Sequence, residues 1–144
     1  MINKELLRTK IESIQRDLER LQEYSSMSFD TVAKDWKAYS VVKLLLMEII
    51  GRAIDCNQHI ISESEGAGVA SPLDYRQTFL RLEEMGILPQ SFAEEIAKSA
   101  GFRNAIVHGY NNLDTKLVYR SIGDALSQYT TYCGQLLSYI NTVK

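Results

Sequence analysis

The chain has 144 residues, of which 45% are hydrophobic and 24% are charged, which suits one globular domain with its own core and excludes a disordered chain. Its formal net charge of −2 and its isoelectric point near 5.7 argue against a protein that holds nucleic acid through a bulk positive field. Two prolines and eight glycines are too few for a β-sandwich or a repeat array with frequent turns. The composition therefore favours a single helical domain over residues 1–144.

Three long segments carry apolar residues at alternating spacings of three and four, the pattern of a helix that buries one face. The first stripe is Leu7, Ile11, Ile14, Leu18 and Leu21. The second is Val42, Leu46, Ile49, Ala53, Cys56 and Ile60. The last is Val118, Ile122, Ala125, Tyr129, Tyr132, Leu136 and Tyr139. We expect these three helices to supply most of the core, with the second helix beginning near Asp30.

A shorter helix is expected after the second stripe. Residues 66–72 contain two glycines, a serine and a proline and are typical of a loop. Ser71 is expected to cap the helix, with Pro72 at its first position, because serine accepts from free amide groups and proline needs no donor there. This helix carries Tyr75 on its apolar face and ends at Gly86.

A fourth helix opens at Pro89 or Ser91 and ends at Gly109, which is expected to be its C-cap. Asn112 or Asp114 then caps the last helix, since both side chains accept from free amides. The sequence thus predicts about five helices joined by short connections. An all-α, up-and-down helical bundle is the architecture that such a chain favours.

The two cysteines and the N-terminal segment bear on the compartment. Cys56 and Cys133 lie far apart in apolar segments, with no C-x-x-C pair and no histidine at metal spacing, so we expect reduced core residues. The first residues carry charges and no apolar run long enough for a signal peptide or a membrane span. We therefore expect a cytoplasmic protein that does not contact membranes.

The most informative segment covers residues 103–110 and has the pattern R-x4-H-x-Y, formed by Arg103, His108 and Tyr110. Cleavage of RNA needs a base or acid for proton transfer, and histidine titrates near neutrality. It also needs a cation for the charge on phosphorus, and the arginine fork matches phosphate oxygens. No convergent carboxylates or His/Cys ligand sets demand a metal. The residues thus favour RNA cleavage without a metal or cofactor.

Spacing limits what one chain can do with this pair. Five residues along a helix rotate Arg103 from His108 by about 140° and separate them by roughly 7.5 Å of rise. A homodimer that juxtaposes two helix ends would build one site from both chains, and we expect this assembly. A simpler interpretation stays open, in which Arg103 makes a surface ion pair, His108 complements the helix dipole and Gly109 caps the helix.

A line of polar residues interrupts the second helix: Glu48, Arg52, Asp55 and His59 share one face at spacings of four, three and four. One interpretation is a solvated stripe of ion pairs. The other places Asp55 near the motif, where its carboxylate orients Arg103 or His108. We expect His59 to be a surface or interface histidine.

Several segments together resemble the HEPN-domain toxins of the HepT family, the bacterial and archaeal partners of minimal nucleotidyltransferases (MNT). The resemblance covers about residues 40 to 120. It is carried by the segments 53–61, 74–79, 86–89 and 102–110. The R-x4-H-x-Y pattern, with polar Asn104 directly after the arginine, is the most specific of them, and this sequence matches it throughout.

The resemblance implies a toxin of a toxin–antitoxin pair, namely a metal-independent endoribonuclease that acts on RNA as a homodimer. It implies that Arg103 and His108 are catalytic and that Asn104 supports them. It further implies that an MNT-type antitoxin uses ATP to transfer AMP to Tyr110, placing bulk and negative charge beside a site built for an RNA phosphate. The alternative is a non-catalytic HEPN module that binds nucleotide or scaffolds a nucleotidyltransferase.

Overall fold

The computed structural model describes residues 1–109 and 113–143, and within them all regular structure is helical. Seven helices follow one another in these two ranges: α1 (Lys4–Ser25), α2 (Phe29–Lys34), α3 (Trp36–Glu65), α4 (Ala67–Ala70), α5 (Tyr75–Glu84), α6 (Gln90–His108) and α7 (Thr115–Thr142). The predicted all-α class is confirmed. None of the described helices is both long enough and apolar enough to cross a membrane.

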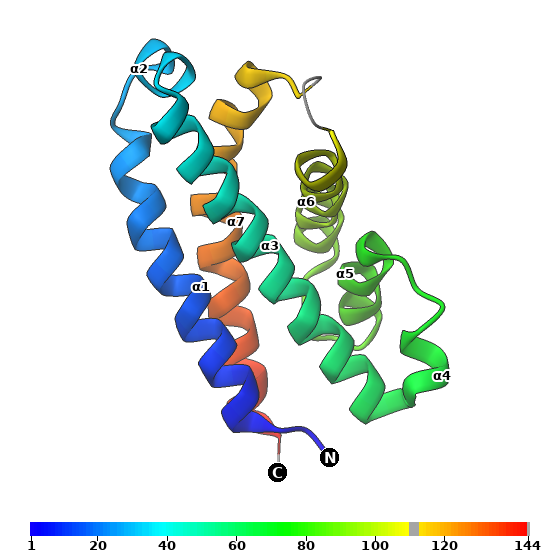
Figure 1. Ribbon diagram of the computed structural model, residues 1–144. Coiled ribbons are helices and arrows are strands. Elements are labelled where there is room, and N and C mark those ends of the chain that lie inside the picture. Colours follow the sequence, from blue (N-terminus) through cyan, green and yellow to red (C-terminus); the bar gives the residue numbers. More distant parts are fainter. Residues whose placement is uncertain (110–112, 144) are drawn as a thin grey trace.

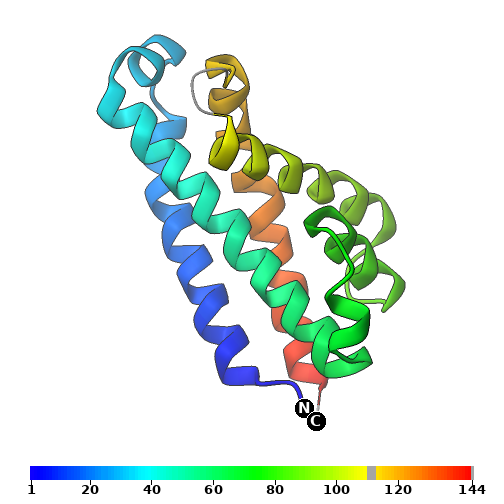
Figure 2. The ribbon, with the colours of Figure 1, turned by 45° about the vertical axis from the view of Figure 1, so that its right-hand side comes forward.

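The three long helices α1, α3 and α7 lie side by side, and α3 contacts every other described helix (Figure 1). Helices α5 and α6 pack against each other and against α3, on the side of α3 that faces away from α1. Helix α6 crosses the long helices steeply (Figure 2). Because α3 lies between α1 on one side and the α5–α6 pair on the other, a residue on α3 can contact either of them.

The predicted apolar stripes form the core. All five residues of the first stripe and all six of the second are buried. The last stripe is buried from Val118 to Leu136, while Tyr139 packs against the core from a half-buried position. The periodicity of the sequence therefore identified the buried faces of α1, α3 and α7 correctly.

The long central helix begins later than the sequence suggested. It was expected to start near Asp30, but Asp30 belongs to the six-residue α2, and the chain breaks at Asp35 before α3 begins. Asp35 has extended backbone angles (φ −88°, ψ 106°), and its side chain accepts from the Lys37 amide at 3.0 Å. A capping carboxylate satisfies a free donor at the start of a helix, which makes Asp35 the N-cap of α3.

The connection to α5 also differs from its prediction. The expected loop 66–72 contains the single turn α4, and α5 begins at Tyr75 rather than at Pro72. The cap is Asp74 instead of Ser71, because Asp74 and Gln77 bond each other's backbone amides at 2.7 and 2.8 Å. This reciprocal capping box satisfies two donors where Ser71 would satisfy one.

Candidate functional site

The Arg103 side chain of α6 is half-buried between α3 and α5. Its Cζ atom lies 5.3 Å from the ring centroid of Tyr75, the first residue of α5. On the α3 side, a Cβ added to Gly51 would lie 3.7 Å from Arg103 Nε. The guanidinium therefore occupies a narrow space between an aromatic ring and a helix backbone.

The charge of Arg103 is not neutralised by a carboxylate within residues 1–109 and 113–143. Its Nε is buried without a hydrogen-bond partner there, and no ion pair to Arg103 occurs among the described residues. The surface ion pair of the simpler interpretation is thus missing from this part of the chain. A guanidinium on an aromatic face keeps its charge, and its remaining donors suit phosphate oxygens.

His108 is the last residue of α6 and is exposed to solvent. Gly109 follows as the C-cap, as predicted, with backbone angles of φ −79° and ψ −17°. A Cβ at position 109 would collide with the Ala105 carbonyl oxygen, so glycine suits this helix end. Exposed His108 and half-buried Arg103 thus belong to different sides of α6, as their spacing predicted.

The remaining motif residues have different positions. Asn104 is exposed on α6, directly after Arg103. Tyr110, the predicted site of modification, lies outside the described residues, as does Asn112. Asp114 caps α7 by accepting from the Lys116 amide at 2.9 Å. In the described ranges, no three His, Cys, Asp or Glu side chains are arranged to hold a metal ion.

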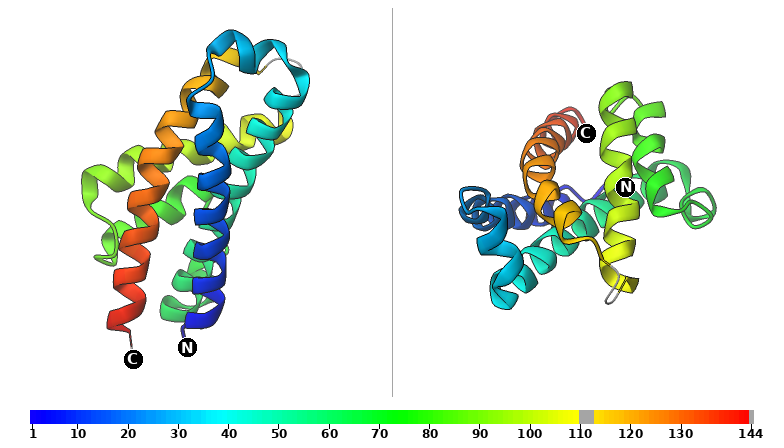
Figure 3. Two further views of the ribbon diagram at one scale, coloured as in Figure 1. Left: turned by 90° about the vertical axis from the view of Figure 1, so that its left-hand side faces the viewer. Right: turned by 90° about the horizontal axis from the view of Figure 1, so that it is seen from above.

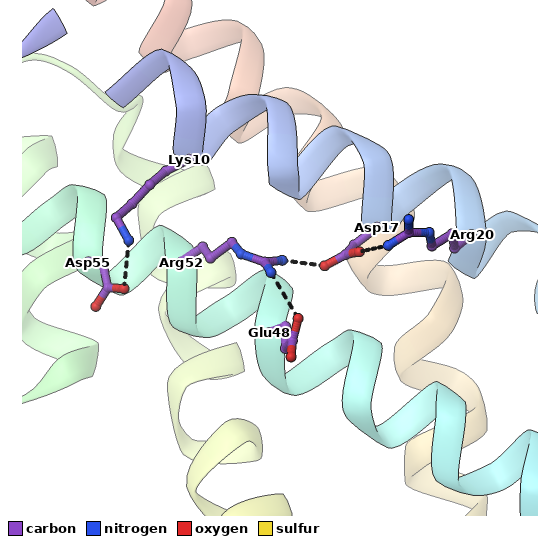
Figure 4. Close-up of polar contacts among 6 residues, drawn as sticks. All are labelled: Lys10, Asp17, Arg20, Glu48, Arg52 and Asp55. Carbon is purple, nitrogen blue, oxygen red and sulfur yellow. Dashed lines mark hydrogen bonds and ion pairs between the residues drawn. The ribbon is translucent and has the colours of Figure 1, made fainter. Parts of the chain in front are cut away.

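The polar line on α3 lies beside α1 and is partly exposed to solvent, with the Asp55 side chain 53% and the Glu48 side chain 43% accessible (Figure 4). Arg52 donates to Glu48 at 2.9 Å, which confirms the expected i,i+4 pair, and it also pairs with Asp17 of α1. Asp17 accepts from Arg20 at 3.0 Å as well and is only 3% exposed. The interpretation as a stripe of ion pairs is therefore supported, and the structure adds that the stripe also pairs with carboxylate and ammonium groups of α1.

Asp55 and His59 continue this line toward the start of α1. Asp55 accepts from Lys10 Nζ at 3.2 Å, and His59 Nε2 accepts from the Asn3 backbone amide at 3.0 Å. His59 is thus an interface histidine within the chain. The contact described for Asp55 is to α1, and its role beside Arg103 stays a prediction that its place one turn from Gly51 permits.

Buried polar groups connect α7 to the start of α5. The Tyr132 hydroxyl lies 2.5 Å from Asn57 Oδ1 and 3.0 Å from the Ala53 carbonyl oxygen. The amide of Asn57 donates to the Thr78 hydroxyl at 3.1 Å, and that hydroxyl donates to the Tyr75 carbonyl at 2.7 Å. The side chains of Tyr132, Asn57 and Thr78 are fully buried. This chain of hydrogen bonds ties the first turn of α5 to α3.

The sequence matches the family Ribonuclease HepT-like over residues 14–136. The chain belongs to this family. Over 139 residues it is 32% identical to the tRNA nuclease HepT of Aphanizomenon flos-aquae, a match that covers 96% of this chain and 92% of the relative. It is 24% identical over 129 residues to the mRNA nuclease HepT of Shewanella oneidensis, covering 89% and 93% of the two chains.

Solved structures agree on the fold. A structure of the tri-AMPylated Shewanella oneidensis HEPN toxin in complex with MNT antitoxin matches with a TM-score of 0.80 at 22% identity. The match covers 92% of this chain and 97% of the other. The HEPN-like fold expected from the sequence is thereby confirmed. The predicted membership in the HepT family is confirmed by the family match over residues 14–136 and by the 32% identical relative.

Sequence analysis missed two residues of this HepT-like site, Gly51 and Tyr75. Tyr75 was assigned to an apolar face, but it is 37% exposed and its ring lies against Arg103. A usable signal was the spacing of Asp74 and Gln77, which is typical of a capping box and would have made Tyr75 the first residue of the helix. Gly51 had only the signal of a glycine within a helix, where a close approach is one reason for its presence.

An apolar cavity of about 400 Å³ lies between α3, α6 and α7. Its apolar lining includes Leu46, Ile50, Phe102, Ala105 and Leu117. Phe102 and Ala105 point about 100° and 160° away from Arg103 around α6, at 100° per residue. The cavity and the Arg103 site of the HepT-like chain therefore use different faces of the same helix.

Proposed function

We propose that this HepT-like protein is the toxin of a HEPN/MNT toxin–antitoxin pair and an endoribonuclease that needs no metal. The observation that carries the proposal is the Arg103 guanidinium, held on the Tyr75 ring with no carboxylate among the described residues, five positions before an exposed histidine at a helix end. Both relatives described above are named as nucleases, one of tRNA and one of mRNA.

The proposed reaction is an internal transesterification. A 2′-hydroxyl oxygen attacks the adjacent phosphorus, the bond to the 5′-oxygen breaks, and the products carry a 2′,3′-cyclic phosphate and a 5′-hydroxyl. His108 transfers the proton, since an exposed imidazole at a helix end is accessible to the substrate and can act as a general acid or base. Arg103 stabilises the negative charge that develops on the phosphoryl oxygens. Asn104 supports the pair, and Asp55 is proposed to orient it.

A homodimer completes the site in this proposal. Arg103 and His108 point to different sides of one α6, by about 140° around the helix axis. A second copy that brings its own helix end alongside would place one chain's histidine near the other's arginine, and two-fold symmetry would create two such sites.

Regulation by an antitoxin follows from the same chemistry. We propose that an MNT-type nucleotidyltransferase uses ATP to attach AMP to Tyr110, two residues after His108. The added phosphate would repel the RNA backbone from Arg103, and its bulk would cover the helix end. A structure of the tri-AMPylated Shewanella oneidensis HEPN toxin in complex with MNT antitoxin supports AMP transfer as the form of regulation. We place both proteins in the cytoplasm.

The test is cleavage of a mixed RNA pool by unmodified protein in excess chelator. Wild-type protein is expected to produce ends with 5′-hydroxyl groups, and His108→Ala and Arg103→Ala are expected to lower the rate by about 100-fold or more. Arg16→Ala removes an exposed arginine from α1 and serves as the matched control.

Two results would overturn the proposal. Cleavage that survives both substitutions would place the chemistry elsewhere. A complete lack of cleavage, in protein whose mass shows no AMP, would favour the non-catalytic module that binds nucleotide or scaffolds a nucleotidyltransferase. Cleavage that disappears only with chelator would leave a ribonuclease but contradict its metal independence.

A further inference from the structure

We propose that Tyr75 is a positioning residue whose ring orients the Arg103 guanidinium for the RNA phosphate, an inference that rests on the proposed function of Arg103. The role is indirect: Tyr75 acts on the reaction through the arginine that it contacts. Three independent features of the structure lead to this assignment.

The first feature is the contact itself. The Cζ atom of Arg103 lies 5.3 Å from the centre of the Tyr75 ring. This separation is within the range of a cation–π interaction, which attracts a guanidinium to an aromatic face without neutralising it. A carboxylate would also fix the arginine, but it would compete with the phosphate for the same donors. An aromatic ring fixes the group and leaves its charge available.

The second feature is the α3 backbone at Gly51, which lies on the other side of the Arg103 guanidinium from the Tyr75 ring. Gly51 presents the α3 backbone to the guanidinium, and a methyl group there would already lie 3.7 Å from Nε, at ordinary contact distance. Nε itself is buried and has no hydrogen-bond partner among the described residues. Packing between the ring and α3, rather than hydrogen bonding of Nε, therefore sets the orientation of the side chain.

The third feature is the anchoring of the Tyr75 backbone, which carries the ring. The Tyr75 carbonyl accepts from Thr78, which in turn accepts from Asn57 of α3. Asn57 is six residues along α3 from Gly51. Both walls of the space around Arg103 are thus fixed to the same helix. Such rigid support is what a group needs when its position must be correct before substrate arrives.

Two substitutions separate the ring from the hydroxyl of Tyr75. Tyr75→Phe keeps the aromatic face, and we expect its kcat to stay within about twofold of wild type. Tyr75→Leu removes the face, and we expect kcat to fall by about tenfold or more with KM changed by less than about threefold, because a misplaced catalytic group lowers kcat. Tyr75 is 37% exposed, so both variants should fold.

A double-mutant cycle separates positioning from a general structural effect. In the Arg103→Ala background, Tyr75→Leu should cause no further loss of cleavage, because the residue it would position is absent. An additional tenfold loss in that background would overturn the inference. Wild-type kcat in the Tyr75→Leu single variant would do the same, and either result would leave the proposed ribonuclease function intact.

A spectroscopic measurement tests the contact without relying on activity. The ring current of Tyr75 should shift the δ-methylene protons of Arg103 in the NMR spectrum of wild-type protein and of Tyr75→Phe. The shift should disappear in Tyr75→Leu. An unchanged resonance in Tyr75→Leu would overturn the inference. Wild-type protein that shows the shift but cleaves no RNA would instead overturn the proposed function, together with the catalytic role of the contact.

Discussion

Two arginines, one that belongs to α3 and one that reaches α3 from α6, have opposite surroundings. Arg52 pairs with two carboxylates, Glu48 on its own helix and Asp17 on α1. Arg103 approaches α3 at Gly51, the residue before Arg52, and contacts the Tyr75 ring instead. The comparison shows how one helix can use the same side-chain type for two purposes. A neutralised cation joins helices, whereas a cation without a carboxylate is available to a ligand.

The largest expected effect separates the two arginines by function. We expect Arg103→Gln to lower RNA cleavage by about 100- to 1,000-fold, because it removes the charge that we propose to act in the transition state. The free energy of unfolding should change by less than about 1 kcal/mol, since only a cation–π contact is lost. Arg52→Gln should instead leave the rate of cleavage close to that of wild type and lower the free energy of unfolding by more than about 1 kcal/mol. Cleavage rates and urea unfolding of both variants measure this, and equal losses of activity would contradict the comparison.

The next effect concerns the carboxylate that Arg52 uses. Asp17 is 3% exposed and accepts from two arginines, so Asp17→Ala leaves a half-buried guanidinium without its main partner and should lower the free energy of unfolding by about 3 kcal/mol. Asp30→Ala is the control, because the Asp30–Lys34 pair is exposed and 3.9 Å long. It should cost less than about 0.5 kcal/mol. Chemical denaturation distinguishes the two variants.

A smaller effect concerns the buried hydrogen bonds that hold Tyr75, the residue beside Arg103, to α3. Thr78→Val removes the hydroxyl that joins Asn57 to the Tyr75 carbonyl and should lower the free energy of unfolding by about 1 to 3 kcal/mol, because the buried Asn57 amide loses its acceptor. Thr130→Val is the matched control, since the Thr130 hydroxyl is exposed and donates to the Leu126 carbonyl of its own helix. Equal stability of both variants would show that the buried chain contributes little.

The smallest effect on stability near neutral pH concerns the cysteines, which are free and buried. Burial raises the pKa of Cys56 and of Cys133 to about 12, above the value of about 8.5 for an unfolded thiol. The folded state therefore favours the neutral thiols, and their contribution to stability is complete below about pH 8.5 and is lost as pH rises toward 12. At pH 8 a thiol reagent should label both cysteines in urea and neither in native protein.

The fold was largely predictable because helical periodicity is a local property of the sequence. Helix boundaries were less so, since several residues compete for each cap. Asp30 and Asp35 were both possible starts for the long helix, and the bond from the Lys37 amide to Asp35 decided between them. Asp74 prevailed over Ser71 because Gln77 completes its capping box. These outcomes depend on contacts that composition and spacing do not reveal.

For the candidate site, the sequence pointed to residues with suitable side-chain chemistry but not to the residues that surround them. Arg103 and His108 stood out because their side chains suit phosphate binding and proton transfer. Tyr75 and Gly51 did not, because they approach Arg103 from α5 and α3, 28 and 52 residues earlier in the chain. Asp17 escaped notice for the same reason: its partner Arg52 is 35 residues away, and the charge lay within an apolar stripe.

Helix α7 runs from the region near the end of α6 to the opposite end of the bundle, and this arrangement offers a place to attach a label. It begins six residues after Gly109 and has 28 residues, which corresponds to a length of about 42 Å. Its far end lies beside the start of α1 (Figure 3). A fluorophore or surface tether attached at either of these ends would sit at the opposite end of the bundle from the helix end that carries His108. Attachment there leaves the helix end that carries His108 uncovered in measurements of the proposed interactions.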